Sequence, residues 1–295
     1  METVGPTGGF LEVPRLLESS RPLPRVNLTW WVGGGFLLVL IVSGLIGNQT
    51  AASKALVSAV WGLATVALMG AMSAFSVYTI RRFRLDQRRV EQIGELVQLR
   101  RWPDAAVAVD QYLSQPARTH SFRAQALVYL SQVLARLHRF EDAIAVQTGL
   151  LEEGMLDDAS AATLRIGRAM AMLREDHLFD ADRAISELRR SVAAGTAGVI
   201  LLEIYRDVKT GHPLEAIELF EQKLGVLRDQ LGHRVADAYG LAARAYDLAG
   251  READAAAAFR NATLLSPAAE LFRRYPEVEK LGGRYHPAPA PPEAL

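Results

Sequence analysis

The pattern of apolar and polar positions divides the chain into three parts. Residues 26–53 and 55–80 contain no charged residue. From about residue 85 onwards, apolar residues recur at the spacing of an α-helix, and no strand-like alternation bounded by turns interrupts them. The first 25 residues and the last 15 are instead rich in proline and glycine. The pattern therefore predicts an all-α protein in which two apolar helices precede a helical domain.

The two uncharged segments are long enough to cross a lipid bilayer. Its hydrocarbon core takes about 20 apolar residues in a helix, which predicts spans at 28–46 and 56–80. Trp30 and Trp31 at the start of the first span suit an aromatic belt at the membrane interface. Neither span carries Asp, Glu, Lys, Arg or His, so neither offers an ion or proton path. We expect a transmembrane hairpin over residues 26–80 that acts as an anchor.

Basic residues give the hairpin its orientation. The connection between the spans carries Lys54 alone, whereas the juxtamembrane segment 81–89 that follows the second span is strongly basic. Its arginines are Arg81, Arg82, Arg84, Arg88 and Arg89. The positive-inside rule then predicts that both termini are cytoplasmic, at the cytoplasmic membrane of a bacterium. The formal net charge is zero, so we expect these arginines to set topology and meet anionic lipid, with no nucleic-acid partner.

Two alternatives concern the hairpin. The first span could be a cleaved signal peptide, but its length and the long tail before it argue against this. Small residues also recur at four-residue spacing, at Ser58 and Gly62 and at Gly70 and Ala74. Such spacing lets helices approach closely, within the hairpin or between two copies in a homo-oligomer.

A repeating phrase organises residues 90–280. Every second predicted helix opens with similar residues around an alanine, and these alanines are 38, 41, 32 and 39 positions apart. They are Ala105, Ala143, Ala184, Ala216 and Ala255. Predicted helix breaks separate the phrases, for example at Gly154, Gly211 and Gly250. A helix pair recurring at this length predicts an α-solenoid, because each pair must bury its apolar face against the next.

The last of these helix pairs resembles a tetratricopeptide repeat. That family's pattern has W-x2-L-G-x2-Y, then A-x3-F, then P. The matching residues here are Tyr239, Ala242, Ala243, Tyr246, Ala255, Phe259, Ala262 and Pro267. The second pair matches more loosely, through Leu127, Leu130, Ser131, Leu134, Ala143 and Leu150. The other pairs keep little beyond the alanine, so three to five repeats fit, and residues 268–280 are expected to form a short capping helix.

The resemblance implies a surface that binds proteins. In the tetratricopeptide family, the first helix of each pair lines a concave groove that holds a partner. Carried over to this chain, the groove positions are Gln125, Val128 and Gln132 in the second pair, and Asp237, Gly240, Arg244 and Asp247 in the last. The Lys, Asn and Arg set with which some members clamp a peptide carboxylate is missing, and Arg244 and Asp247 could equally be solvated surface charges.

Nothing in the sequence points to catalysis. The chain has no cysteine, and its six histidines are scattered beside predicted helix breaks without metal-ligand spacing. Asp157 and Asp158 precede a predicted helix, so capping explains this carboxylate pair. We therefore expect neither an enzyme nor a cofactor or metal site.

These features lead to one leading hypothesis and one alternative. The first is a scaffold anchored in the membrane by residues 26–80, whose repeats (90–280) bind a protein partner. Before the anchor lies a flexible tail (1–25) with one short turn around residues 13–19, and after it the juxtamembrane segment. Residues 281–295 would be a disordered proline-rich tail. The alternative is an obligate structural subunit of a larger membrane complex.

Overall fold

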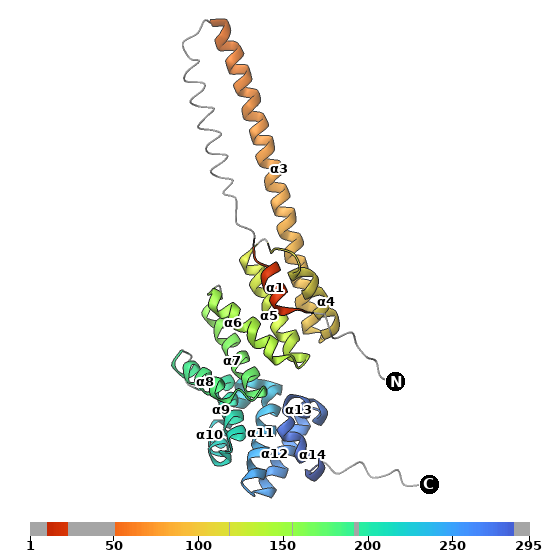
Figure 1. Ribbon diagram of the computed structural model, residues 1–295, viewed down its shortest axis with the longest axis vertical. Coiled ribbons are helices and arrows are strands. Elements are labelled where there is room, and N and C mark those ends of the chain that lie inside the picture. The colour runs from red at the N-terminus through yellow and green to blue at the C-terminus, as the bar shows by residue number, and fades with distance from the viewer. Residues whose placement is uncertain (1–10, 23–50, 118, 155, 192–194, 286–295) are drawn as a thin grey trace, which may run out of the picture. The chain divides into compact units, whose positions relative to one another are not determined.

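The computed structural model describes residues 11–22, 51–117, 119–154, 156–191 and 195–285, apart from the side chains of 51–61, 64, 68 and 191. Every regular element among these residues is a helix, so the predicted all-α class is confirmed for this part of the chain (Figure 1). The helices are α1 (Val13–Ser19), α3 (Ala51–Gln98), α4 (Trp102–Leu113), α5 (His120–Arg136), α6 (Phe140–Glu153), α7 (Asp158–Arg174), α8 (Leu178–Ser191), α9 (Ala197–Thr210), α10 (Pro213–Leu231), the 3-10 turn η1 (Gly232–Arg234), α11 (Val235–Leu248), α12 (Glu252–Leu265), α13 (Ala268–Arg274) and α14 (Pro276–Tyr285).

Local signals place the helix ends as expected. Pro103 and Pro213 lie in the first turns of α4 and α10, where a missing N–H costs no helical hydrogen bond. Gly154 and Gly211 end α6 and α9 with φ of 62° and 78°, a conformation that suits glycine. Asp157 caps α7 by accepting a hydrogen bond from the Ser160 amide. The predicted breaks at Gly154, Gly211 and Gly250 fall between helices.

Helix α3 runs without interruption through three predicted segments. The second predicted span, 56–80, the juxtamembrane segment and the start of the repeat region all belong to this one helix. The first predicted span, 28–46, lies outside the described residues. Within the described residues, no helix is both long and apolar enough to cross a membrane.

The chain divides within α5 into two compact units, residues 1–129 and residues 130–295. In the first unit, α3 packs on α4, and α1 also packs on α4. Leu11, Val13 and Leu16 are at most 2% exposed there. Residues 11–22 are therefore an ordered part of this unit, and the prediction of a flexible tail was wrong for them. The short turn expected around residues 13–19 corresponds to α1, but three apolar side chains among prolines give no periodic signal that it would pack on the rest of the unit.

In the second unit, consecutive helices pack against each other, α6 on α7, α7 on α8, α9 on α10 and α11 on α12. The first helices of successive pairs also touch, because α9 contacts both α7 and α11. The repeated alanines lie at these contacts: Ala143, Ala216 and Ala255 are fully buried. A small side chain at these positions lets the backbones of neighbouring helices approach closely.

The end of the chain differs from the predicted single capping helix. It forms two helices, α13 and α14, which meet at Tyr275 just before Pro276. The proline removes an N–H and disfavours a helical residue before it, so one continuous helix cannot form here. Helix α14 continues to Tyr285, so residues 281–285 do not belong to the predicted disordered tail, and residues 286–295 lie outside the described residues.

Candidate binding surfaces

The predicted groove positions of the last helix pair are not open to solvent. Asp237 is fully buried and Gly240 is buried on α11, while the side chains of Arg244 and Asp247 are only 17% and 7% exposed. The expectation of an open groove at these residues, and of solvated charges at Arg244 and Asp247, was therefore wrong. The reason is that α13 and α14 of the same chain pack on this face of α11 (Figure 1).

Apolar contacts hold the two terminal helices on α11 and α12. A Cβ atom added to Gly240 would lie 3.7 Å from both Leu271 of α13 and Val278 of α14, which shows how closely these helices approach. Leu271, Val278 and Leu281 are fully buried. Phe272 stacks on Phe259 of α12 with 6.2 Å between ring centroids. The apolar side of α14 therefore covers surface of α11 and α12 that would otherwise be open.

Ion pairs reinforce this packing. The Arg274 Nη1 atom lies 2.7 Å from Asp237 Oδ1, and Arg284 Nη1 lies 2.6 Å from Asp247 Oδ1. Arg244 lies 2.6 Å from the other carboxylate oxygen of Asp247. The last helix pair thus presents carboxylates, and the chain's own end supplies the arginines that neutralise them.

The same terminal segment also meets α9, at residues that the repeat pattern did not single out. The Tyr205 hydroxyl donates to Glu277 of α14 at 3.3 Å, and Lys209 Nζ lies 3.1 Å from the same carboxylate. The rings of Tyr205 and Tyr275 meet edge to face at 5.2 Å. The sequence held a signal for this contact, because residues 199–205 of α9 are too apolar for a helix with a solvated face. In the structure every one of them is buried.

Burial dominates the electrostatics of this cluster. It raises the pKa of Asp237, although Arg274 and Arg234 oppose that rise. Burial also raises the pKa values of Tyr205 and Tyr275, so both phenols stay protonated at neutral pH. The guanidinium of Arg174 lies over the Tyr275 ring, 5.5 Å from its centroid. The cluster thus packs α7, α9, α11 and the terminal helices together, and most of its charged side chains are paired.

The groove positions on α5 differ from those on α11. Gln125 and Gln132 are exposed, and Val128 is half-buried. Gln125 donates to the Tyr129 hydroxyl at 3.2 Å. Seven residues separate the two glutamines, so they lie on one face of α5. The described structure thus leaves this face accessible, in contrast to the face of α11.

The five arginines of the juxtamembrane segment lie on α3, and all are exposed. Arg82 lies over the Tyr78 ring, 5.1 Å from its centroid. No ion pair joins any of the five to a carboxylate of the described residues, although Asp86 lies among them. The segment therefore presents a cluster of positive charge.

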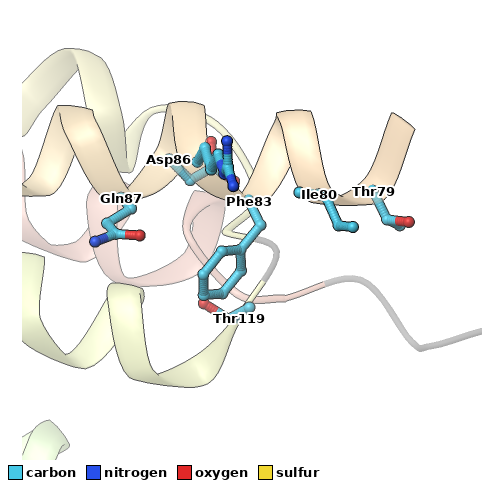
Figure 2. Close-up of a pocket in the computed structure, with 7 residues that line it drawn as sticks. Thr79, Ile80, Phe83, Asp86, Gln87 and Thr119 are labelled. Atoms are coloured by element: carbon cyan, nitrogen blue, oxygen red, sulfur yellow. The ribbon is translucent and has the colours of Figure 1, made fainter. Parts of the chain in front are cut away.

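Two cavities flank α3 at this segment. The first has a volume of about 430 Å³ and is lined largely by apolar atoms of Ile80 and Phe83 together with Gln87 and Thr119. Figure 2 shows Phe83 pointing towards Thr119, on the side of α3 that also carries Ile80 and Gln87. The Phe83 ring packs on Phe122 of α5, with 4.9 Å between centroids.

The second cavity is polar and lies between α3 and the end of α4. Its volume is about 520 Å³, and it is lined by Arg82, Asp86, Arg89, Tyr112, Gln115, Pro116 and Ala117. Burial and the neighbouring Asp86 raise the pKa of Tyr112 to about 12, against an opposing effect of Arg89. Its hydroxyl therefore stays a hydrogen-bond donor at neutral pH.

No group of three or more His, Asp or Glu side chains within the described part of the chain is placed to hold a metal ion.

Comparisons with models of known protein families, with curated proteins and with solved structures find no match to this chain.

Proposed function

We propose that this protein is a membrane-anchored, tetratricopeptide-like scaffold that binds a protein partner at the cytoplasmic face of a bacterial membrane. The hairpin of residues 26–80 holds it there, and the helix pairs carry the binding surface. The observation that carries the proposal is the surface of α3, whose apolar part leads directly into the juxtamembrane segment.

Exposed apolar side chains support the anchor. Between Leu63 and Ile80, large apolar residues of α3 are about half exposed or more. They are Leu63, Val66, Met69, Met72, Phe75, Val77, Tyr78 and Ile80. Soluble proteins rarely expose so continuous an apolar surface, which is typical of contact with lipid or with another protein. The arginines that follow suit the headgroup layer on the cytoplasmic side.

The helix pairs support the scaffold. Contacts of α9 with both α7 and α11 align first helices side by side, as a repeat array requires. Since the face of α11 is covered by α13 and α14, we assign partner binding to the exposed face of α5, at Gln125 and Gln132. Anchoring raises the local concentration of a bound partner at the membrane.

The test is a purification of tagged full-length protein from its native cells in mild detergent, after crosslinking, with mass spectrometry of what accompanies it. A stoichiometric soluble partner that is lost in the Q125R/Q132R variant supports the scaffold. The matched control is Q222R, at an exposed glutamine of α10, which should retain the partner. A set of membrane subunits in fixed ratio would favour the structural-subunit alternative, and an empty purification would contradict both.

A separate measurement tests the anchor. Membranes are washed with alkaline carbonate, and the protein is then followed by immunoblotting. An integral anchor keeps it in the pellet, whereas release into the supernatant would contradict the hairpin.

A further inference from the structure

The polar cavity between α3 and α4 has the features of an anion site. We propose that it binds the headgroup phosphate of an anionic phospholipid, held by Arg82 and Arg89 of α3 and by the hydroxyl of Tyr112 on α4. This inference rests on the proposed function, because a lipid reaches the cavity only if α3 emerges from a bilayer beside it.

The positions of the two arginines on α3 support this assignment. Arg82 and Arg89 are seven residues apart and therefore lie on one face of the helix, two turns apart and separated by roughly 10 Å along its axis. Both line the same cavity, whereas Arg81 and Arg88 line neither cavity at this segment. The geometry thus places two of the five arginines at one open cavity.

The charge around the cavity favours an anion. Arg82 and Arg89 have no ion pair with a carboxylate of the described residues. Asp86 also lines the cavity and contributes one negative charge against two positive ones. A phosphate group provides acceptors for arginine forks and for a phenol donor together. A bound phosphate would therefore accept hydrogen bonds from the two exposed guanidinium groups and from the phenol.

The floor of the cavity is held in place by α1. The Leu113 carbonyl at the end of α4 accepts a hydrogen bond from the Ser19 hydroxyl at 2.8 Å. The Ser20 carbonyl accepts another from the Ala117 amide at 3.2 Å. These bonds fix the segment after α4 that carries Pro116 and Ala117, two of the residues that line the cavity.

The position of the cavity along α3 fits a headgroup. Ile80 is the last residue of the apolar part of α3, and Arg82 follows two residues later. The polar layer on each side of a bilayer is roughly 5–8 Å thick, which is comparable with the axial separation of Arg82 and Arg89. The cavity would thus open at the level of the lipid phosphates.

The experiment uses the full-length protein in lipid nanodiscs that contain phosphatidylglycerol and phosphatidylcholine in equal amounts. Native mass spectrometry measures which lipid stays bound after the disc is removed. We expect the wild type to retain phosphatidylglycerol preferentially. The R82Q/R89Q variant should lose at least about tenfold of that preference, since each arginine near the lipid contributes about a factor of five to anionic lipid binding. The matched comparison is R81Q/R88Q, which removes the same charge outside the cavity and should lose less of the preference, because Arg81 and Arg88 attract anionic lipid through their charge alone.

Every outcome bears on the proposal. Equal loss in both variants would show that charge alone attracts the lipid and would overturn the site. Retention of phosphatidylglycerol by R82Q/R89Q would also overturn it. If lipid-free protein in detergent binds inorganic phosphate through Arg82 and Arg89 but shows no lipid preference, the ligand is a soluble anion. Failure to enter nanodiscs at all would instead contradict the anchor, which separates that failure from failure of the headgroup site.

Discussion

Asp237 and Arg274 form an ion pair, with a buried carboxylate and a partly exposed guanidinium, that fastens the end of the chain to α11. The carboxylate on α11 is 1% exposed, and the guanidinium on α13 lies 2.7 Å from it. Taking both charges out of water costs free energy, which their mutual attraction repays only when the geometry is good. The packing of α13 on α11 therefore depends on this one pair of residues.

Replacing Arg274 should loosen the terminal helices. In R274M, Asp237 loses its closest cation, and removing one partner of a buried pair costs about 3–5 kcal/mol. We expect amide hydrogen exchange of α13 and α14 in the full-length protein to speed up, while exchange in α7 and α8 changes little. The control R273M removes the exposed neighbouring arginine and should leave this exchange near the wild-type rate. Equal protection of α13 in R274M would contradict the role of the pair.

Two glycines in this region should respond oppositely to alanine. A Cβ at Gly240 meets Leu271 and Val278 at ordinary contact distance, 3.7 Å, so G240A should raise stability by about 0.5–1 kcal/mol by favouring the helix. A Cβ at Gly282 would lie 2.8 Å from the Phe272 ring, which already stacks on Phe259, so G282A should lower stability. Denaturant unfolding of full-length protein, followed by circular dichroism, checks both. The same sign for both variants would contradict this packing.

Stability should depend on pH through His138. Burial, reinforced by Arg174, Arg273 and Arg136, lowers the pKa of this imidazole below its usual 6.5. The unfolded chain then binds the proton more readily, so this contribution to folding is present above about pH 6.5 and is lost as pH falls through the folded pKa. The free energy of unfolding of the wild type and of H138N, measured at pH 5 and pH 7.5, tests this. Asparagine is the replacement because it tolerates the positive φ of 59° at this position. An identical pH dependence in both proteins would refute the assignment.

The packing of α1 should depend on Arg123. This side chain of α5 is 2% exposed, and it donates from Nε to the Ser20 hydroxyl at 3.0 Å and from Nη2 to the Leu17 carbonyl at 3.1 Å. A helix of seven residues is not stable by itself in water, so R123M should release it. Hydrogen exchange over residues 13–19 should then approach that of an unfolded segment. The exposed Arg15 of α1 supplies the control R15M, which should leave exchange unchanged.

Much of the helix layout could be read from local sequence signals. Pro103, Pro213, Gly154 and Gly211 all mark helix ends in the structure because proline lacks an N–H and glycine accepts positive φ. Such signals depend on the backbone of a few neighbouring residues. They therefore hold whatever the surrounding tertiary structure is.

The binding surface could not be predicted in the same way. The repeat pattern correctly made α11 the first helix of a pair, yet it assigned Asp237 and Gly240 to an open groove that α13 and α14 fill. The short stretch at Leu11, Val13 and Leu16 likewise gave no sign that it would pack on α4. In both cases the partner surface lies far away in the chain.

Helix periodicity and glycine or proline punctuation were enough to establish the all-α class and the helix ends within the described residues. Only the tertiary structure decided which apolar face each helix covers, and hence that α5 keeps an accessible face and α11 does not. The physical reason is that an amphipathic stripe requires burial but does not specify its partner. Hydrophobic burial is non-directional, and the choice depends on packing and on ion pairs such as Asp237 with Arg274.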